Sequence, residues 1–200
     1  MNEALENKLS LACWIGQQLY TRHMGPGTTG NLSFLHENTL YITRSGVCFG
    51  QLTPADFSAV NLADGSIEGP KPSKELPIHQ LAYDQRPDIT AVLHVHSTYA
   101  VLWSVLPHEN PADCIPAYTP YLEMKLGTVG LIDFGMPGSN ELVEAFKKQA
   151  PLSDGWILKN HGPLIGGKTL MDAFACLEEL EESCRLAWEL KDLPQAAKIR

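Results

Sequence analysis

The chain has 200 residues, of which 44% are hydrophobic, and its formal net charge is −8 at pH 7. This length and apolar content predict one globular domain over residues 1–200, for which no second domain core is needed. The acidic balance argues against a general binder of nucleic acid or of anionic membranes, because phosphate-rich surfaces repel such a protein, although a small phosphorylated ligand can still bind in a local pocket.

Neither export nor membrane insertion is expected from the sequence. The opening residues MNEALE lack a basic leader followed by an apolar stretch, and no later run approaches the roughly 18 apolar residues of a membrane span. The five cysteines are scattered and form no CxxC pair, which favours reduced thiols over disulfide bonds or a thiolate zinc site. These features predict a cytoplasmic protein.

Apolar residues recur with helical spacing in some segments and form short runs between turn residues in others, which predicts alternating helices and strands. In chain order we expect a helix over about 2–23, hairpin strands at 31–35 and 40–43, a helix capped by Ser73 and extending over 76–82, a strand at 89–96, a helix from Ser97 to about 106, strands at 129–134 and 156–158, and a helix from Thr169 to about 188. In the last helix, a solvated acidic face is expected at Glu178, Glu179, Glu181 and Glu182.

Two histidines, His94 and His96, end the apolar run 89–96. Because alternate side chains of a strand lie on the same face, both imidazoles are expected to project together where the strand ends. This arrangement suits a divalent metal, for which imidazole is the commonest ligand. Two alternating histidines can equally lie on the polar face of a strand, so the pair alone does not decide between these interpretations.

Two further residues could complete a metal site. His161 lies where a predicted strand ends in the turn NHGP, and three histidines leave zinc a fourth position for water or substrate, as a catalytic site requires. Glu75 could ligate the metal at rest and transfer a proton once substrate displaces it. It could also simply interact with the dipole at the start of its helix.

Segments rich in small and hydroxylated residues could hold a phosphate through backbone N–H groups, although most such segments are only turns. They are 27–33, Ser45-Gly46 and Ser73-Lys74, in which Lys74 adds a positive charge.

Residues 162–169, GPLIGGKT, match the phosphate-loop pattern of nucleotide hydrolases and lie between a predicted strand and a predicted helix. Only 31 residues follow Thr169, which leaves little room for the downstream parallel strands of such a fold. A turn at Lys168 and a helix cap at Thr169 is the simpler interpretation.

Taken in order, GTTGNLS (27–33), TRSG (43–46), PSKE (72–75), HVH (94–96) and NHG (160–162) resemble the class II aldolase/adducin family, and the resemblance spans almost the whole chain. It implies an α/β fold, specifically a three-layer α/β/α sandwich with a largely antiparallel central sheet. It further implies one Zn²⁺ per subunit, or another divalent metal, and a homotetramer with sites between neighbouring subunits. The residue roles that it implies are metal binding by His94, His96 and His161, acid/base catalysis by Glu75, phosphate or substrate binding by Thr28, Gly30, Asn31, Ser45, Gly46 and Ser73, and a catalytic Tyr121 contributed across a subunit interface.

Lys74 stands where the sugar-phosphate aldolases of this family have a serine, and KPSKE (71–75), YTPY (118–121) and LEELEE (177–182) resemble its 3-oxo-tetronate 4-phosphate decarboxylases more closely. That resemblance implies zinc-dependent decarboxylation to dihydroxyacetone phosphate and CO₂ through an enediolate that zinc stabilises as a Lewis acid. Glu75 or Tyr121 would protonate the enediolate, while Lys74 and the loop 27–31 hold the phosphate.

Two alternatives stay open. One is a sugar-phosphate aldolase like fuculose-1-phosphate aldolase, or an epimerase or dehydratase, with the same metal site. The other is a non-enzymatic adducin-like interaction module. The presence of all three histidines and of Glu75 argues against the second alternative, because a module without catalysis has no need of them.

Overall fold

The computed structural model describes residues 2–193 and 196–199 of the chain. At its centre is an eight-stranded sheet with the order β4-β3-β2-β1-β5-β8-β7-β6. The strands are β1 (Asn31–His36), β2 (Thr39–Thr43), β3 (Phe57–Asn61), β4 (Ile67–Glu68), β5 (Ala91–His94), β6 (Val129–Ile132), β7 (Gly155–Leu158) and β8 (Gly162–Gly167). Every neighbouring pair in the described sheet is antiparallel except β6 with β7, so the predicted largely antiparallel sheet is confirmed.

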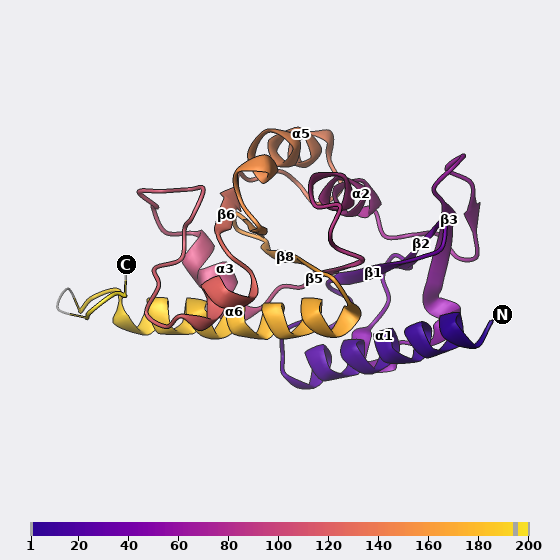
Figure 1. The fold of residues 1–200 in the computed structure, drawn as a ribbon, viewed down its shortest axis with the longest axis horizontal. Helices are drawn as coiled ribbons and strands as arrows, with labels where there is room; N and C mark the ends of the chain where they lie inside the picture. The colour runs from indigo at the N-terminus through magenta and orange to yellow at the C-terminus, as the bar shows by residue number, and fades with distance from the viewer. Residues whose placement is uncertain (1, 194–195, 200) are drawn as a thin grey trace.

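Helices cover both faces of the sheet, which gives the three layers of the predicted α/β/α sandwich (Figure 1). Below the sheet in that view lie α1 (Glu3–Thr21) and α6 (Leu170–Leu190), and above it lie α2 (Leu76–Gln85) and α5 (Asn140–Gln149). A separate apolar core lies on each side, because each helix pair buries its own apolar stripe against the sheet. The shorter helical elements are α3 (Thr98–Ser104), α4 (Tyr121–Lys125), η1 (Phe49–Gln51), η2 (Pro54–Asp56) and η3 (Ala150–Leu152).

The first and last helices begin where the sequence predicted, each with a side-chain cap. Asn2 Oδ1 accepts a hydrogen bond from the Leu5 N–H at 2.8 Å, and Thr169 Oγ1 accepts one from the Asp172 N–H at 3.1 Å. These side chains bond N–H groups of the first helical turn, which have no carbonyl partner four residues earlier within the helix.

The nucleotide-hydrolase alternative is wrong. Residues 162–167 form the buried strand β8, which is hydrogen-bonded to β5 on one side and to β7 on the other. A phosphate loop must instead present its free backbone N–H groups to the ligand.

Two predicted boundaries differ from the structure next to the candidate site residues. Glu75, and not Ser73, occupies the N-cap position of α2, while Ser73 Oγ accepts a hydrogen bond from the Glu75 N–H at 3.3 Å. The strand predicted at 89–96 ends earlier, because β5 stops at His94. Glu75 therefore lies at the start of a helix, and His96 lies in the loop that follows a strand.

The predicted solvated acidic face of α6 is wrong at Glu181. Its carboxylate accepts hydrogen bonds from Ser97 Oγ at 2.7 Å and from the backbone N–H groups of Tyr99 and Ala100 at 2.8 and 3.0 Å. Ser97 does stand at the N-cap position of α3, but its side chain makes no cap hydrogen bond. A carboxylate from a distant helix caps α3 instead, because it brings a full negative charge to the positive end of the helix dipole.

Two further expectations concern membranes and thiols. Within the described ranges, no helix is long and apolar enough to cross a membrane. The five cysteines are free thiols, and all are buried except the partly buried Cys48. Reduced cysteines were predicted from their scattered positions.

Candidate active site

Three histidines converge where β5 ends and β8 begins. His94 is the last residue of β5, His161 directly precedes β8, and these two strands are hydrogen-bonded neighbours. His96 reaches the same place from the loop after β5. The ring centroids lie 4.6 to 5.1 Å apart, and one ligand nitrogen from each ring lies within 4.8 Å of the others. The structure thus brings together the pair and the remote third histidine that the sequence predicted as metal ligands.

The turn before β8 places His161 in this cluster. Asn160 adopts a left-handed conformation with φ of 57°, which asparagine tolerates better than most residues. Gly162 then packs against the chain between His94 and His96, where an added Cβ would overlap the Val95 carbonyl oxygen. The sequence Asn160-His161-Gly162 thus allows the close approach of two strand ends, and the histidine between them points at its partners.

Hydrogen bonding and burial both prepare the histidines as ligands. The Nδ1–H of His94 donates to the Pro163 carbonyl at 2.9 Å, which leaves the lone pair of Nε2 facing His161 Nε2 at 3.2 Å. Burial, reinforced at His161 by the neighbouring His94, lowers the pKa of each of these two imidazoles to about 3. Neutral imidazoles with a lone pair directed inward are the form that binds a metal ion.

Glu75 faces the same point from the start of α2. Its Oε2 lies 3.4 Å from His94 Nε2, and its Oε1 lies 3.6 Å from His161 Nε2. Asn31 Nδ2 donates to Oε2 at 2.7 Å, whereas the buried Oε1 has no hydrogen-bond partner among the described residues. The Glu75 side chain is only 5% exposed, so a charged oxygen without a partner calls for a cation or a proton.

The donor set fits a zinc ion. Four ligand atoms about 2.0–2.1 Å from a tetrahedral zinc lie about 3.3 Å from one another. The distances between the Glu75 oxygens and the nitrogens of His94 and His161, and between those two nitrogens, are 3.2 to 3.6 Å. Nitrogen and carboxylate donors at these separations match the chemistry of a catalytic zinc site.

A cavity of about 170 Å³ opens beside the histidines. All seven residues that the sequence assigns to phosphate or substrate binding line it, together with Glu75, His96 and His161. The cavity wall also includes Thr29, from the predicted phosphate loop 27–31, and Arg44 and Pro137, to which the sequence analysis assigned no role. Arg44 lies inside the motif TRSG and could have been noticed as its cation; in the structure its Nε donates to Asp56 Oδ1 at 2.6 Å.

Tyr121 lies outside the cavity that most of the other predicted site residues of the same chain line. It is the first residue of α4, it is 55% exposed, and it is not among the residues that line the cavity. Its predicted role across a subunit interface stays a prediction.

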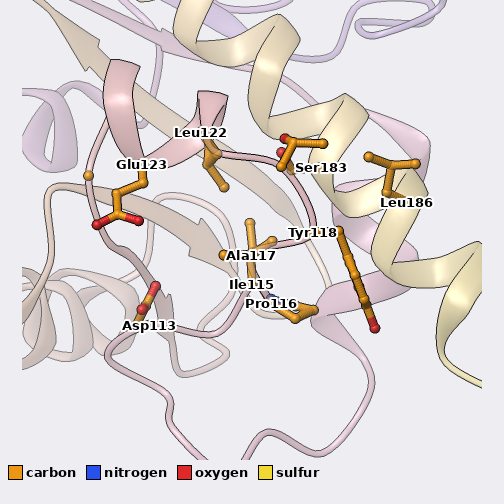
Figure 2. A pocket seen from close by; sticks show the side chains of 11 residues that line it. Asp113, Ile115, Pro116, Ala117, Tyr118, Leu122, Glu123, Ser183 and Leu186 are labelled. Atoms are coloured by element: carbon orange, nitrogen blue, oxygen red, sulfur yellow. The ribbon is translucent and has the colours of Figure 1, made fainter. Parts of the chain in front are cut away.

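A second hollow lies between α6 and the segment 113–127, seen from close by in Figure 2. Tyr118, Leu122 and Ser183 are among its lining residues. Its volume is about 10 Å³, room for about one water molecule. This hollow is therefore far too small to compete as a substrate site.

Comparisons with known proteins agree with the fold. Residues 11–188 match the model of the family described as class II aldolase and adducin N-terminal domain. The chain is 37% identical to a 3-oxo-tetronate 4-phosphate decarboxylase from Pectobacterium atrosepticum, over 89% of this chain and 82% of that protein. It is 36% identical to an L-fuculose phosphate aldolase from Methanococcus vannielii, over 84% of this chain and 88% of that protein. Among solved structures, YgbL from Klebsiella pneumoniae superposes with a TM-score of 0.90 at 34% identity, over 98% of this chain and 94% of that one.

Proposed function

The chain belongs to the class II aldolase and adducin N-terminal domain family, and we propose that it is a metal-dependent lyase that decarboxylates a 3-oxo-tetronate 4-phosphate to dihydroxyacetone phosphate and CO₂. The observation that carries this proposal is the meeting of three histidines and Glu75 beside a cavity that His96, His161 and Glu75 line. Phosphate binding is the second requirement, and the small-residue loops and Lys74, which line the same cavity, would supply it.

His94, His96 and His161 would hold the divalent cation, with zinc the first choice for three imidazole donors and with Glu75 as a further ligand at rest. When bound, the cation supplies a Lewis acid that polarises the ketone oxygen of the substrate. The protein orients its ligands in advance, because the Pro163 carbonyl holds the tautomer and the ring orientation of His94.

The phosphate would lie against the glycine-containing loops. Gly30 and Gly46 both have left-handed backbone conformations, with φ of 86° and 71°. A Cβ at Gly30 would lie 2.8 Å from the His94 carbonyl oxygen, so only glycine lets this loop approach the metal-binding strand. Backbone N–H groups and hydroxyls in these loops suit phosphate oxygens, and the Lys74 ammonium adds a positive charge at the same cavity.

The reaction needs one proton at a defined place. The bond between C1 and C2 of the substrate breaks, CO₂ leaves, and the electron pair passes into the C3 ketone to give an enediolate. A proton added at C2 then yields dihydroxyacetone phosphate. Asn31 occupies Glu75 Oε2 as a hydrogen-bond donor, so Oε1 is the atom that holds the proton and delivers it. Tyr121 from a neighbouring subunit of a homotetramer is the other proposed donor.

The aldolase alternative rests on its own observation, since the fuculose phosphate aldolase relative is 36% identical. Both reactions pass through an enediolate of the same kind, so the metal ligands and Glu75 serve either one. Lys74, which replaces a serine found in the aldolases that the sequence resembles, favours the decarboxylase.

A substrate test separates these functions. The zinc-loaded protein is incubated with both configurations of 3-oxo-tetronate 4-phosphate and, separately, with L-fuculose 1-phosphate, while CO₂ and dihydroxyacetone phosphate are measured. We expect equal amounts of both products from one 3-oxo acid. Dihydroxyacetone phosphate from the aldol substrate, with no CO₂ from either 3-oxo acid, would establish the aldolase instead.

Replacement of Lys74 by methionine is expected to raise KM for the phosphorylated substrate by about 10- to 100-fold, because a hydrogen bond to a charged group contributes about 1.5–3 kcal/mol. Methionine keeps most of the side-chain stem that packs near Gly138, so the loop should hold its shape. Steady-state kinetics measure the effect. Lys71→Met, in the same loop but outside the cavity lining, is the matched control. Equal KM values for the two variants would contradict a phosphate contact by Lys74.

A further inference from the structure

We propose that a buried chain of hydrogen bonds running from Tyr83 through Ser33, His79 and Asn31 positions the carboxylate of Glu75, with His79 as its central positioning residue. This inference rests on the proposed catalytic role of Glu75. The hydrogen-bond chain adds Tyr83, Ser33 and His79 to the site. These three residues neither line the cavity nor belong to the cluster of metal ligands.

The contacts form an unbroken series between α2 and β1. Tyr83 Oη lies 2.8 Å from Ser33 Oγ, which lies 2.8 Å from His79 Nδ1. His79 Nε2 is hydrogen-bonded to Asn31 Oδ1, and Asn31 Nδ2 donates to Glu75 Oε2 at 2.7 Å. Ser33 and His79 are fully buried, and Asn31 and Glu75 are at most 5% exposed, so water has little access to compete for these bonds.

The two elements bring these residues together through their own periodicities. Glu75 and His79 are four residues apart at the start of α2, so they lie on one face of the helix. Asn31 and Ser33 are two residues apart on β1, so they lie on one face of the strand. When α2 packs over β1, the pair on the helix meets the pair on the strand, and the bonds alternate between the two elements.

The chemistry of each group fixes the direction of every bond. An ionised carboxylate only accepts, so Asn31 must turn its NH₂ group to Glu75 and its Oδ1 to His79. His79 must therefore carry its proton on Nε2. His79 is fully buried and a hydroxyl, not an anion, faces its second ring nitrogen, so the neutral ring fits this site and its Nδ1 accepts from the Ser33 hydroxyl. Ser33 Oγ in turn accepts from the hydroxyl of Tyr83.

The fixed direction of these hydrogen bonds holds the Asn31 amide in one orientation toward Glu75. An asparagine amide can rotate by half a turn, and the rotated Asn31 would aim its oxygen at the carboxylate of Glu75 and repel it. The N–H of His79 opposes that rotation, because it would then face an NH₂ group and lose its acceptor. His79 thus keeps Glu75 Oε2 occupied and leaves Oε1 directed toward His161.

Two amide substitutions at His79 test this role. The nitrogen of glutamine can reach the place of Nε2 and donate to Asn31, whereas asparagine is too short to do so and replaces only Nδ1. We expect His79→Asn to lower kcat by about 10- to 100-fold, the usual effect of removing a partner behind a metal-site carboxylate. With zinc supplied in excess, KM and the zinc content should stay within about 2-fold of the wild type, because the substituted side chain neither lines the cavity nor belongs to the three histidine ligands. His79→Gln should recover most of kcat.

If the His79 variants fold poorly, substitutions at two comparable serines provide a second test of the proposal. Ser33 and Ser58 are both fully buried, and both face Ile42 across neighbouring strands, so they lie in one row on one face of the sheet. Ser58 Oγ donates to the Pro70 carbonyl, outside the hydrogen-bond chain. Ser33→Ala should lower kcat several-fold, whereas Ser58→Ala should leave the kcat of the folded protein unchanged. Equal kcat values for these two variants, or for His79→Asn and His79→Gln, would overturn the proposal.

A spectroscopic measurement separates this proposal from the proposed reaction. Nitrogen-15 NMR of protein labelled at histidine reports the tautomer of each ring, and the His79 signals are identified by their loss in His79→Gln. We expect a proton on Nε2 and none on Nδ1. The opposite tautomer would overturn the hydrogen-bond chain whatever the substrate proves to be, whereas a wild-type protein that releases no CO₂ would overturn only the decarboxylase function.

Discussion

The substitution His94→Ala is expected to remove the bound metal and to lower lyase activity by at least about 1000-fold, since Lewis-acid stabilisation of the transition state contributes several kcal/mol. His94 is fully buried, and its Nε2 lies close to both His161 and Glu75. The substitution therefore removes an imidazole that lies beside both the His161 nitrogen and the Glu75 carboxylate. Metal content by mass spectrometry and turnover of the 3-oxo-tetronate 4-phosphate measure the two effects together.

The control for this prediction is His108→Ala. That imidazole also bonds a backbone carbonyl, with Nε2 donating to the Trp103 oxygen at 3.0 Å, but it belongs to no metal cluster in the described part of the chain. It should keep both metal and activity. Chelation of the wild-type protein should abolish turnover, and added zinc should restore turnover in the wild type but not in His94→Ala. Full turnover by metal-depleted wild type would refute the proposed mechanism.

The substitution Glu75→Gln is expected to lower kcat by about 100- to 10,000-fold while the fold and the metal content are retained, because the loss concerns proton transfer. Glutamine has nearly the same shape, and its carbonyl oxygen can still accept from Asn31. It cannot carry the proton that C2 of the substrate must receive. Rapid-quench or steady-state kinetics with parallel metal analysis measure the change.

Glu68→Gln, at an exposed position in β4, is the control for Glu75→Gln and should leave kcat unchanged. If Glu75→Gln kept full activity, Glu75 would be a structural residue at the start of α2. If it lost metal and activity in equal measure, Glu75 would act mainly as a ligand.

The helices with long apolar stripes were predicted well, and the strands expected at 31–35, 40–43, 129–134 and 156–158 are also present, but some other elements were missed. α1 and α6 span 19 and 21 residues, enough turns for the period of 3.6 to be visible in the sequence. β3 and the two-residue β4 were missed, because these strands carry little pattern of their own and form by pairing with their neighbours in the sheet. α5 was missed as well, although Ser139 caps it.

The segment 162–169 shows how a local pattern can mislead. Its glycines match a phosphate loop, but in the structure they permit close packing within the fold. An added Cβ at Gly166 would overlap the side chain of Ile89, and one at Gly167 would overlap the backbone of Ala173. Only the segment before β5, which carries Ile89, and the helix α6, which carries Ala173, make these glycines necessary, and neither neighbour is visible in the motif.

The sequence by itself determined the chemistry available: three histidines, one glutamate, a lysine and small-residue loops in an order that resembles a known family. These are properties of side-chain type and of local spacing, which a chain carries before it folds. The tertiary structure decided which atoms meet. His94 and His161 are 67 residues apart, and Asn31 and His79 are 48 apart, so their contacts depend on the register of β1, β5 and β8 and on the packing of α2 over the sheet. For that reason the chain of bonds behind Glu75, and the free Oε1 that it leaves, could be found only in the folded protein.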